Sequence, residues 1–232
     1  MAAIDLTRLN KQIEELNQAF PEPTEFRKRL HGTLQFYHRY AHRQNKDVAP
    51  VSFMRVYDIP NQVLPQIANG LSLKASEDDN ETLGVVDELW KDDHFEARDL
   101  AAHLLGQVPV SSAKEVLERL RQWSSLPLDR AVVKAVFVKG SQRLRAEDPH
   151  RWADFVGELL ESPAPRQQNN GLYALSLLVA QAGSDQLPRF FRWVRPFLPR
   201  DQSLIQLNLR LVVAALARRS PAETHHVLQD VL

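Results

Sequence analysis

The sequence contains no cysteine. This absence excludes disulfide bonds, zinc sites built on thiolates and a cysteine nucleophile. The apolar runs are much shorter than the roughly 20 residues that a membrane-spanning helix requires. The first residues, MAAIDLTRLNKQIEEL, lack a basic segment followed by an apolar one, so no secretory signal is predicted. We therefore expect a cytoplasmic protein without membrane contact.

Motifs that mark common catalytic sites are absent as well. Glycine is scarce, at 8 of 232 residues, and there is no glycine-rich phosphate-binding loop. The G-x-S-x-G motif of serine hydrolases and the H-E-x-x-H motif of zinc proteases do not occur. We therefore predict no bound metal and no small-molecule cofactor.

The net charge is zero, with 29 basic and 29 acidic residues, but the charges are unevenly distributed. Six Lys or Arg residues fall within positions 24–46, and seven Arg residues fall within positions 186–219. Ten acidic residues fall within positions 77–99. This asymmetry fits either basic surfaces that bind a polyanion or charged helix faces that are only solvated.

The spacing of apolar residues is helical nearly throughout. In an early segment, Phe26, Leu30, Leu34 and Tyr37 form one stripe at spacings of three and four. No segment has the sustained alternation of a strand. We predict an all-α protein, with a connector at residues 42–52. The expected helices are residues 5–19, 23–43, 60–73, 80–91, 94–107, 112–123, 129–146, 149–161, 167–182, 186–198, 202–219 and 221–231.

A repeat of 39 residues is visible in the second half of the chain. Pro149 and Pro188 occupy the same slot at two expected helix starts. The other repeating positions are Ala113, Val116, Leu120, Val133, Ala135 and Val136, each with apolar equivalents 39 and 78 residues later. A period near 40 with two helices per unit is typical of HEAT-type repeats, whose units stack because one helix pair cannot bury its own apolar face. We predict a HEAT-like α-solenoid, a curved superhelix of antiparallel helix pairs.

The repeat also suggests a domain organisation. We predict a single domain over residues 1–232. It would consist of an N-terminal helical cap (1–50), irregular repeats (51–110), three regular helix-pair repeats (111–220) and a C-terminal helix (221–232).

The stretch LWKDDHFEARDLAAHLLG, residues 89–106, is dense in acids and histidines. Asp93 and Glu96 have the spacing of a capping box at a helix start. Asp99 and His103 lie four residues apart on one helix face, but two ligands alone are a weak metal signal. We interpret the stretch as a helix start with a surface pair, and Gly106 as the residue at which the chain leaves the helix.

Two segments resemble the DNA alkylation repair (AlkD-like) family of HEAT-repeat proteins: YDIPNQVLPQIANGL (57–71) and LWKDDHFEARDLAAHLLG (89–106). The second matches the family's L-W-x-x-x-x-x-E-x-R-x-L-A-x-x-L-L pattern at Trp90, Glu96, Arg98, Leu100, Ala101, Leu104 and Leu105. LPRFFRWVRPFL and ALARRSPAETHHVL resemble the closing repeats. The resemblance covers residues 24–232 and implies a solenoid whose concave, basic face holds duplex DNA.

The resemblance also implies a catalytic position. Active relatives excise alkylated bases with an Asp at a helix start, assisted by tryptophans and an Arg. In RQWSSLPLDRAVVKA, Asp129 falls at or near the Asp position, but Leu126 and Pro127 replace the paired tryptophans. Asn169 or Asn170 stands where the family has Arg.

These departures favour a DNA-binding protein with little or no base excision. One alternative is an active alkylpurine DNA glycosylase that uses Asp129, and another is a non-catalytic protein-interaction scaffold. The expected partners are therefore duplex DNA or a protein. The candidate DNA-binding residues are Arg27, His31, His38, Arg39, Lys134, Arg143, Arg166, Arg210 and Arg218.

Overall fold

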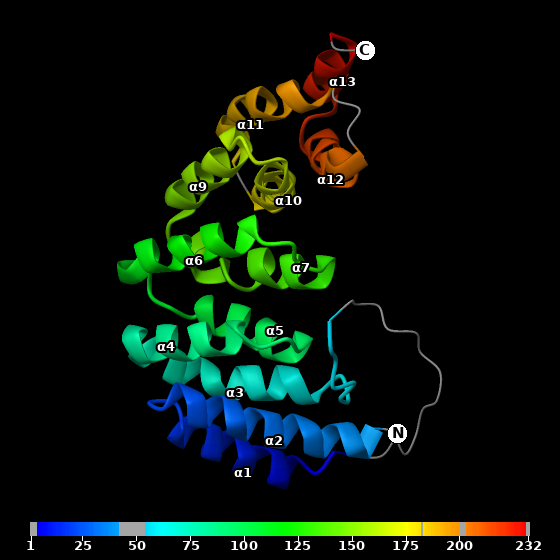
Figure 1. Ribbon diagram of the computed structural model, residues 1–232. Helices are drawn as coiled ribbons and strands as arrows, with labels where there is room; N and C mark the ends of the chain where they lie inside the picture. The colour runs from blue at the N-terminus through cyan, green and yellow to red at the C-terminus, as the bar shows by residue number, and fades with distance from the viewer. Residues whose placement is uncertain (1–3, 42–53, 182, 200–202, 231–232) are drawn as a thin grey trace. The chain divides into compact units, whose positions relative to one another are not determined.

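The computed structural model describes residues 4–41, 54–181, 183–199 and 203–230 (Figure 1). Within these residues the chain forms α-helices and short 3-10 helices, and the only strand-like feature is an isolated bridge between Arg55 and His94. The prediction of an all-α fold is confirmed. The predicted connector at 42–52 lies outside the described residues.

The chain divides into two compact units. Unit 1 comprises residues 1–116 and 128–147, and unit 2 comprises residues 117–127 and 148–232. The helices of unit 1 are α1 (Leu6–Gln18), α2 (Pro23–Ala41), α3 (Val63–Glu77), α4 (Asp79–Trp90), α5 (Phe95–Leu105), α7 (Arg130–Val138) and α8 (Gln142–Glu147). Helix α6 (Ala113–Ser125) begins in unit 1 and ends in unit 2.

In unit 1, helices that are two positions apart along the chain pack on one another. Helix α1 packs on α3, α2 on α4, α3 on α5 and α5 on α7. This alternation is how stacked helix pairs share a continuous core. The predicted apolar stripe of α2 lies in that core, since Phe26, Leu30, Leu34 and Tyr37 are all buried.

Unit 2 contains α9 (Pro149–Glu161), α10 (Pro165–Gln181), α11 (Leu187–Val194), α12 (Ser203–Arg219) and α13 (Pro221–Gln229). Helix α10 packs on both α9 and α12, and α12 packs on α13. Trp152 and Phe155 of α9 are fully buried. This packing is consistent with a helical-repeat solenoid.

The helix starts follow local hydrogen-bonding rules. Asp5, Asp78, Asp129 and Asp148 each precede a helix and accept a hydrogen bond from one of its first backbone N–H groups. Those N–H groups have no partner within the helix, so an Asp at this position stabilises the helix by about 1 kcal/mol.

The 39-residue register is kept from α7 to α10, where Ala135 and Ala174 are both buried, but it is not kept by α12. It predicts Leu172 and Leu211 as equivalent core positions, but Leu172 is buried and Leu211 is 37% exposed. Helix α12 instead buries Leu209 and Val212, which lie 37 residues after Leu172 and Leu175. A period fitted to sequence alone misses such shifts because short differences in loop length rotate a helix relative to its neighbour.

One predicted helix, residues 129–146, is broken in the structure. Helix α7 ends at Val138 and α8 begins at Gln142. The N–H of Gly140 bonds to the carbonyl of Ala135, five residues back, which ends the regular helical pattern. The chain turns here beside the end of α5.

Gly106 lies at that same place and is the C-cap residue of α5, so the predicted end of this helix is confirmed. Its φ angle is −72°, an ordinary right-handed value, so no left-handed cap requires glycine here. A Cβ at this position would lie 1.9 Å from the carbonyl oxygen of Lys139. The residue is therefore glycine because the backbones of α5 and the α7–α8 turn approach too closely for any side chain.

Among the described residues, no helix is both long and apolar enough to cross a lipid bilayer.

Candidate functional site

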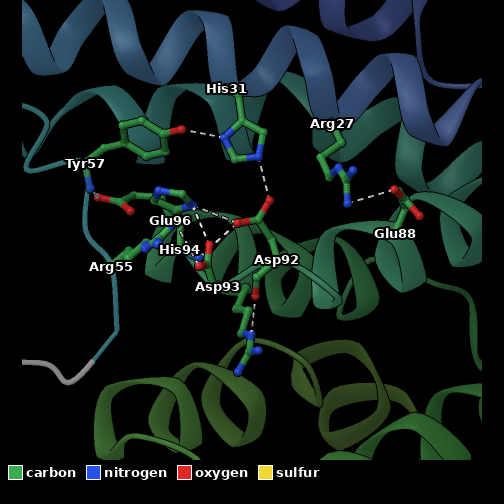
Figure 2. Close-up of polar contacts among 10 residues, drawn as sticks. Arg27, His31, Arg55, Tyr57, Glu88, Asp92, Asp93, His94 and Glu96 are labelled. Carbon is green, nitrogen blue, oxygen red and sulfur yellow. Dashed lines mark hydrogen bonds and ion pairs between the residues drawn. The ribbon is translucent and has the colours of Figure 1, made fainter.

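A cluster of polar side chains lies in unit 1 where α2 meets the turn between α4 and α5. We call His31, Tyr57, Asp92, His94 and Glu96 the polar cluster (Figure 2). His31 comes from α2, Tyr57 precedes α3, and the other three lie at or just before the start of α5. The chain therefore assembles this cluster from three segments.

Asp92 is the centre of the polar cluster and is only 7% exposed. Its Oδ2 lies 2.5 Å from Nε2 of His31. Its Oδ1 accepts the backbone N–H of His94 at 2.9 Å and lies 2.9 Å from Nδ1 of the same residue. Burial alone would raise the pKa of Asp92, but the hydrogen bonds from His94 and the charge of His31 outweigh it and hold that pKa below its ordinary value.

Tyr57 connects the polar cluster to the segment before α3. Its hydroxyl lies 2.6 Å from Nδ1 of His31, and its ring stacks on the imidazole of His94 with centroids 4.4 Å apart. Its carbonyl contacts Nδ1 of His38. Thus His31 and His38, both proposed from sequence to face DNA, converge on Tyr57.

Glu96, on α5, holds the segment around Tyr57 in place. Its Oε1 accepts the backbone N–H of Tyr57 at 2.9 Å. Burial raises the pKa of Glu96, although the backbone hydrogen bonds partly oppose that shift. The predicted capping box is therefore wrong: His94 is the N-cap residue of α5, it has no side-chain cap bond, and Glu96 bonds to Tyr57 instead.

Ion pairs and a guanidinium border the polar cluster. Arg27 contacts Glu88 at 3.0 Å, and Arg55 contacts Asp93 at 3.2 Å. The Nε of Arg98 donates to the backbone carbonyl of Asp92 at 2.8 Å, which fixes the turn before α5. Arg98 is one of the residues that carried the family resemblance.

A cavity of about 600 Å³ lies on another side of α5. Asp99, His103 and Lys139 contribute to its lining. Nζ of Lys139 lies 2.6 Å from Oδ2 of Asp99, and Nε2 of His103 lies 2.9 Å from the hydroxyl of Ser72. Burial, and then the charge of Lys139, lower the pKa of His103. The prediction of a surface pair formed by Asp99 and His103 is wrong, because Asp99 is buried and pairs with Lys139.

Asp129 is the N-cap residue of α7. Its Oδ1 accepts the backbone N–H of Ala131 at 2.8 Å, and the residue is half-buried. Asn170, one of the two residues expected from the resemblance at the family's Arg position, is buried and donates to the carbonyl of Ser124 at 2.9 Å. Trp123 is buried, so its ring is part of the core of unit 2.

The remaining basic candidates differ in their contacts. Lys134, Arg210 and Arg218 are exposed on α7 and α12, and no ion pair with them is found among the described residues. Arg143 bonds to Glu147 and to the carbonyl of Gln107. Arg166 is exposed and reaches the carbonyl of Ser125 at 3.5 Å. The side chain of Arg39 lies outside the described residues.

Sequence reasoning noticed most members of the polar cluster separately but did not join them. From sequence, His31 is a candidate DNA-binding residue, and the stretch that contains Asp92 and His94 is a helix start. His31 and Asp92 are 61 residues apart in the sequence, and no local spacing links them. The signal that could have found the pair was the unusual density of histidines in α2 opposite the acid-rich turn.

Comparison with known proteins identifies the family. The family model described as "DNA alkylation repair enzyme" matches residues 32–230, which is most of the chain. The chain therefore belongs to the DNA alkylation repair family. No curated protein and no solved structure matched it.

Proposed function

We propose that this member of the DNA alkylation repair family binds duplex DNA through exposed basic side chains of its second helices, with base excision weak or absent. The observation that carries this proposal is the family match over residues 32–230. The exposed Lys134 and Arg210 support it, because cations of this kind bind phosphates and release counterions.

The departures from the family pattern support binding over chemistry. The resemblance places Leu126 and Pro127 where active relatives have paired tryptophans, and Asn169 or the buried Asn170 where they have Arg. Asp129 accepts a hydrogen bond at the start of α7, a role that an N-cap Asp fills in many proteins. The resemblance implies that tryptophans and an Arg hold the lesion strand beside this carboxylate in active relatives, and a carboxylate without that positioning is a weak catalyst.

The test is a titration of fluorescent duplex DNA with the full chain at about 50 and about 200 mM salt. Lys134→Ala/Arg210→Ala is the test variant, and Lys114→Ala/Arg151→Ala is the matched control, exposed on the first helices α6 and α9. The test pair should weaken binding several-fold and reduce the salt slope by about 0.9 for each lost phosphate contact. Equal losses in both pairs would place the binding surface elsewhere.

A second candidate function is base excision through Asp129. This residue lies at the start of α7, in the segment that resembles the family's catalytic segment. Asp129→Asn keeps an N-cap acceptor while it removes the charge. Base release from methylated duplex should then vanish without loss of fold. If the wild-type chain releases no base, the activity is absent.

A third candidate is a protein-interaction scaffold. Leu204, Leu207 and Leu211 are exposed along one side of α12. Contiguous apolar surface of this kind is typical of protein-binding sites. A chain that binds neither plain nor methylated duplex, but retains a partner in a pull-down that Leu207→Lys abolishes, would support this alternative over DNA binding.

A further inference from the structure

We propose that the polar cluster binds a divalent transition metal ion of the zinc class, with His31, Asp92 and His94 as ligands. Each of these residues offers one ligand atom, and the three atoms lie within 4.8 Å of one another. Among the described residues, no other group of three such side chains was found. The site is separate from the proposed DNA contacts at Lys134 and Arg210.

The chemical composition of the cluster suits such an ion. Neutral imidazole nitrogens and carboxylate oxygens are common ligands of zinc and its neighbours. Ligand atoms around a tetrahedral zinc ion lie about 3.3 Å apart, given bonds of about 2.0–2.1 Å. Nε2 of His31 lies 2.5 Å from Oδ2 of Asp92, and Nδ1 of His94 lies 2.9 Å from the other carboxylate oxygen, Oδ1. With one ligand atom from each residue, all three lie within 4.8 Å of one another, so side-chain rotations would admit the ion.

The surroundings orient the ligands as a metal site requires. A metal-bound histidine usually donates its second ring N–H to a neighbouring acceptor. The hydroxyl of Tyr57 lies 2.6 Å from Nδ1 of His31, so in the metal-bound form an Nδ1–H can donate to it and the Nε2 lone pair is left for the ion. The Tyr57 ring also stacks on His94 and fixes the plane of that imidazole.

The turn that carries the other two ligands is held as well. Arg98 donates to the carbonyl of Asp92, and the N–H of His94 donates to the Asp92 carboxylate. Asp93 offers a fourth ligand, because its Oδ1 lies 3.1 Å from Nδ1 of His94. Its side chain is 60% exposed, so water could occupy that position instead.

Without an ion, the cluster requires protons between its ligand atoms. His31 and His94 must then each donate an N–H to Asp92, and binding of the ion displaces these protons.

The experiment uses the full chain without an affinity tag, first treated with chelator. Zn²⁺ binding is measured by calorimetry, and Co²⁺ binding by its visible absorption, which depends on the ligands and their geometry. One equivalent of either ion should bind. His31→Gln and Asp92→Asn, which retain hydrogen-bonding groups of similar size, should each weaken binding by about 100-fold or more.

Two further variants separate this site from other histidines. Tyr57→Phe keeps the ring and loses the hydroxyl, so it should weaken binding about tenfold and change the Co²⁺ spectrum. The control, His103→Gln, alters a half-buried histidine of the same unit and should leave binding unchanged. Binding that disappears in His225→Ala/His226→Ala but persists in His31→Gln would overturn the proposal.

A fold defect does not leave the question open. If Asp92→Asn fails to fold, the imidazole NMR signals of the wild-type chain test the metal site instead. Zn²⁺ should shift the signals of His31 and His94 and leave those of His103 in place. Absence of stoichiometric binding, or shifts confined to other histidines, would refute the metal site.

Discussion

The two units use their charged residues differently. In unit 1, Asp92 is buried among histidines and Arg27 is committed to Glu88. In unit 2, Arg210 and Arg218 stand exposed on α12, with no ion pair among the described residues. Both regions are rich in basic residues in the sequence. The comparison teaches that a basic stretch becomes a basic surface only where the fold leaves its charges unpaired.

Within unit 2, charge pairs do occur, but at the surface. Arg189 contacts Asp154 at 2.7 Å, and the two side chains are 42% and 66% exposed. Water screens such a pair, and its contribution to stability is small. The polar cluster of unit 1 is enclosed on several sides, so each partner there depends on the others.

The largest expected effect therefore comes from opening the polar cluster. Asp92→Ala leaves the facing histidines without their buried acceptor and should lower the free energy of unfolding by about 3–5 kcal/mol. The matched change in unit 2, Asp154→Ala, should cost no more than about 1 kcal/mol. Urea unfolding of both variants, in chelator, measures the difference. Similar losses of stability in the two variants would show that Asp92 is as well solvated as Asp154.

The next largest effect on stability is expected where two backbones lie in close contact. Two glycines of unit 1, Gly106 and Gly32, test this. Gly106→Ala places a methyl group against the Lys139 carbonyl, and should destabilise the chain by about 1–3 kcal/mol or more. Gly32→Ala, in α2, meets nothing within 4 Å and should stabilise it by about 0.5–1 kcal/mol. Thermal unfolding reports both. A loss at Gly32, or none at Gly106, would contradict the packing described.

Much of the fold could be predicted from the sequence, because helices depend on local periodicity and capping. Pro149 marked a helix start, and the apolar stripe of α2 marked its buried face. The break after Val138 could not be predicted, since it depends on contact with the end of α5. The register of α12 was missed for a related reason: it depends on loop lengths.

Less of the candidate site could be predicted. The family resemblance rested on Glu96 and Arg98, and these residues prove to hold the segment around Tyr57 and the turn at Asp92. The pairing of His31 with Asp92 is a tertiary contact with no local sequence pattern. Spacing on a helix therefore gave the wrong partners for Glu96 and Asp99, which bond to Tyr57 and Lys139, and it could not predict the partner contributed by α2.

A third, smaller effect is expected on DNA affinity. It compares a basic residue of unit 1, Arg27, with one of unit 2, Arg210. Arg27→Ala removes a cation already paired with Glu88, whereas Arg210→Ala removes one that has no ion pair with any residue the structure describes. We expect duplex affinity to fall several-fold for Arg210→Ala and less than about twofold for Arg27→Ala. Fluorescence anisotropy at low salt measures both. The reverse order would show that α2 contributes the DNA contacts.

The smallest effect is a pH dependence located in unit 1. Burial and Lys139 lower the pKa of His103 below its ordinary value of about 6.5. Above that pH the imidazole is neutral in both the folded and unfolded chain, and it adds no pH dependence. As the pH falls below about 6.5, the unfolded chain takes up the proton first, so stability falls until the pH passes the folded pKa.

His103→Gln removes this titration while it keeps a group that can bond to Ser72. The variant should therefore lose less stability than the wild-type chain between pH 7.5 and pH 5, as measured by urea unfolding midpoints. His150→Gln, an exposed change at the start of α9 in unit 2, should follow the wild-type curve. If His103→Gln and His150→Gln behave alike, the imidazole of His103 is as well hydrated as one at the surface, and the enclosed character of unit 1 does not extend to this cavity.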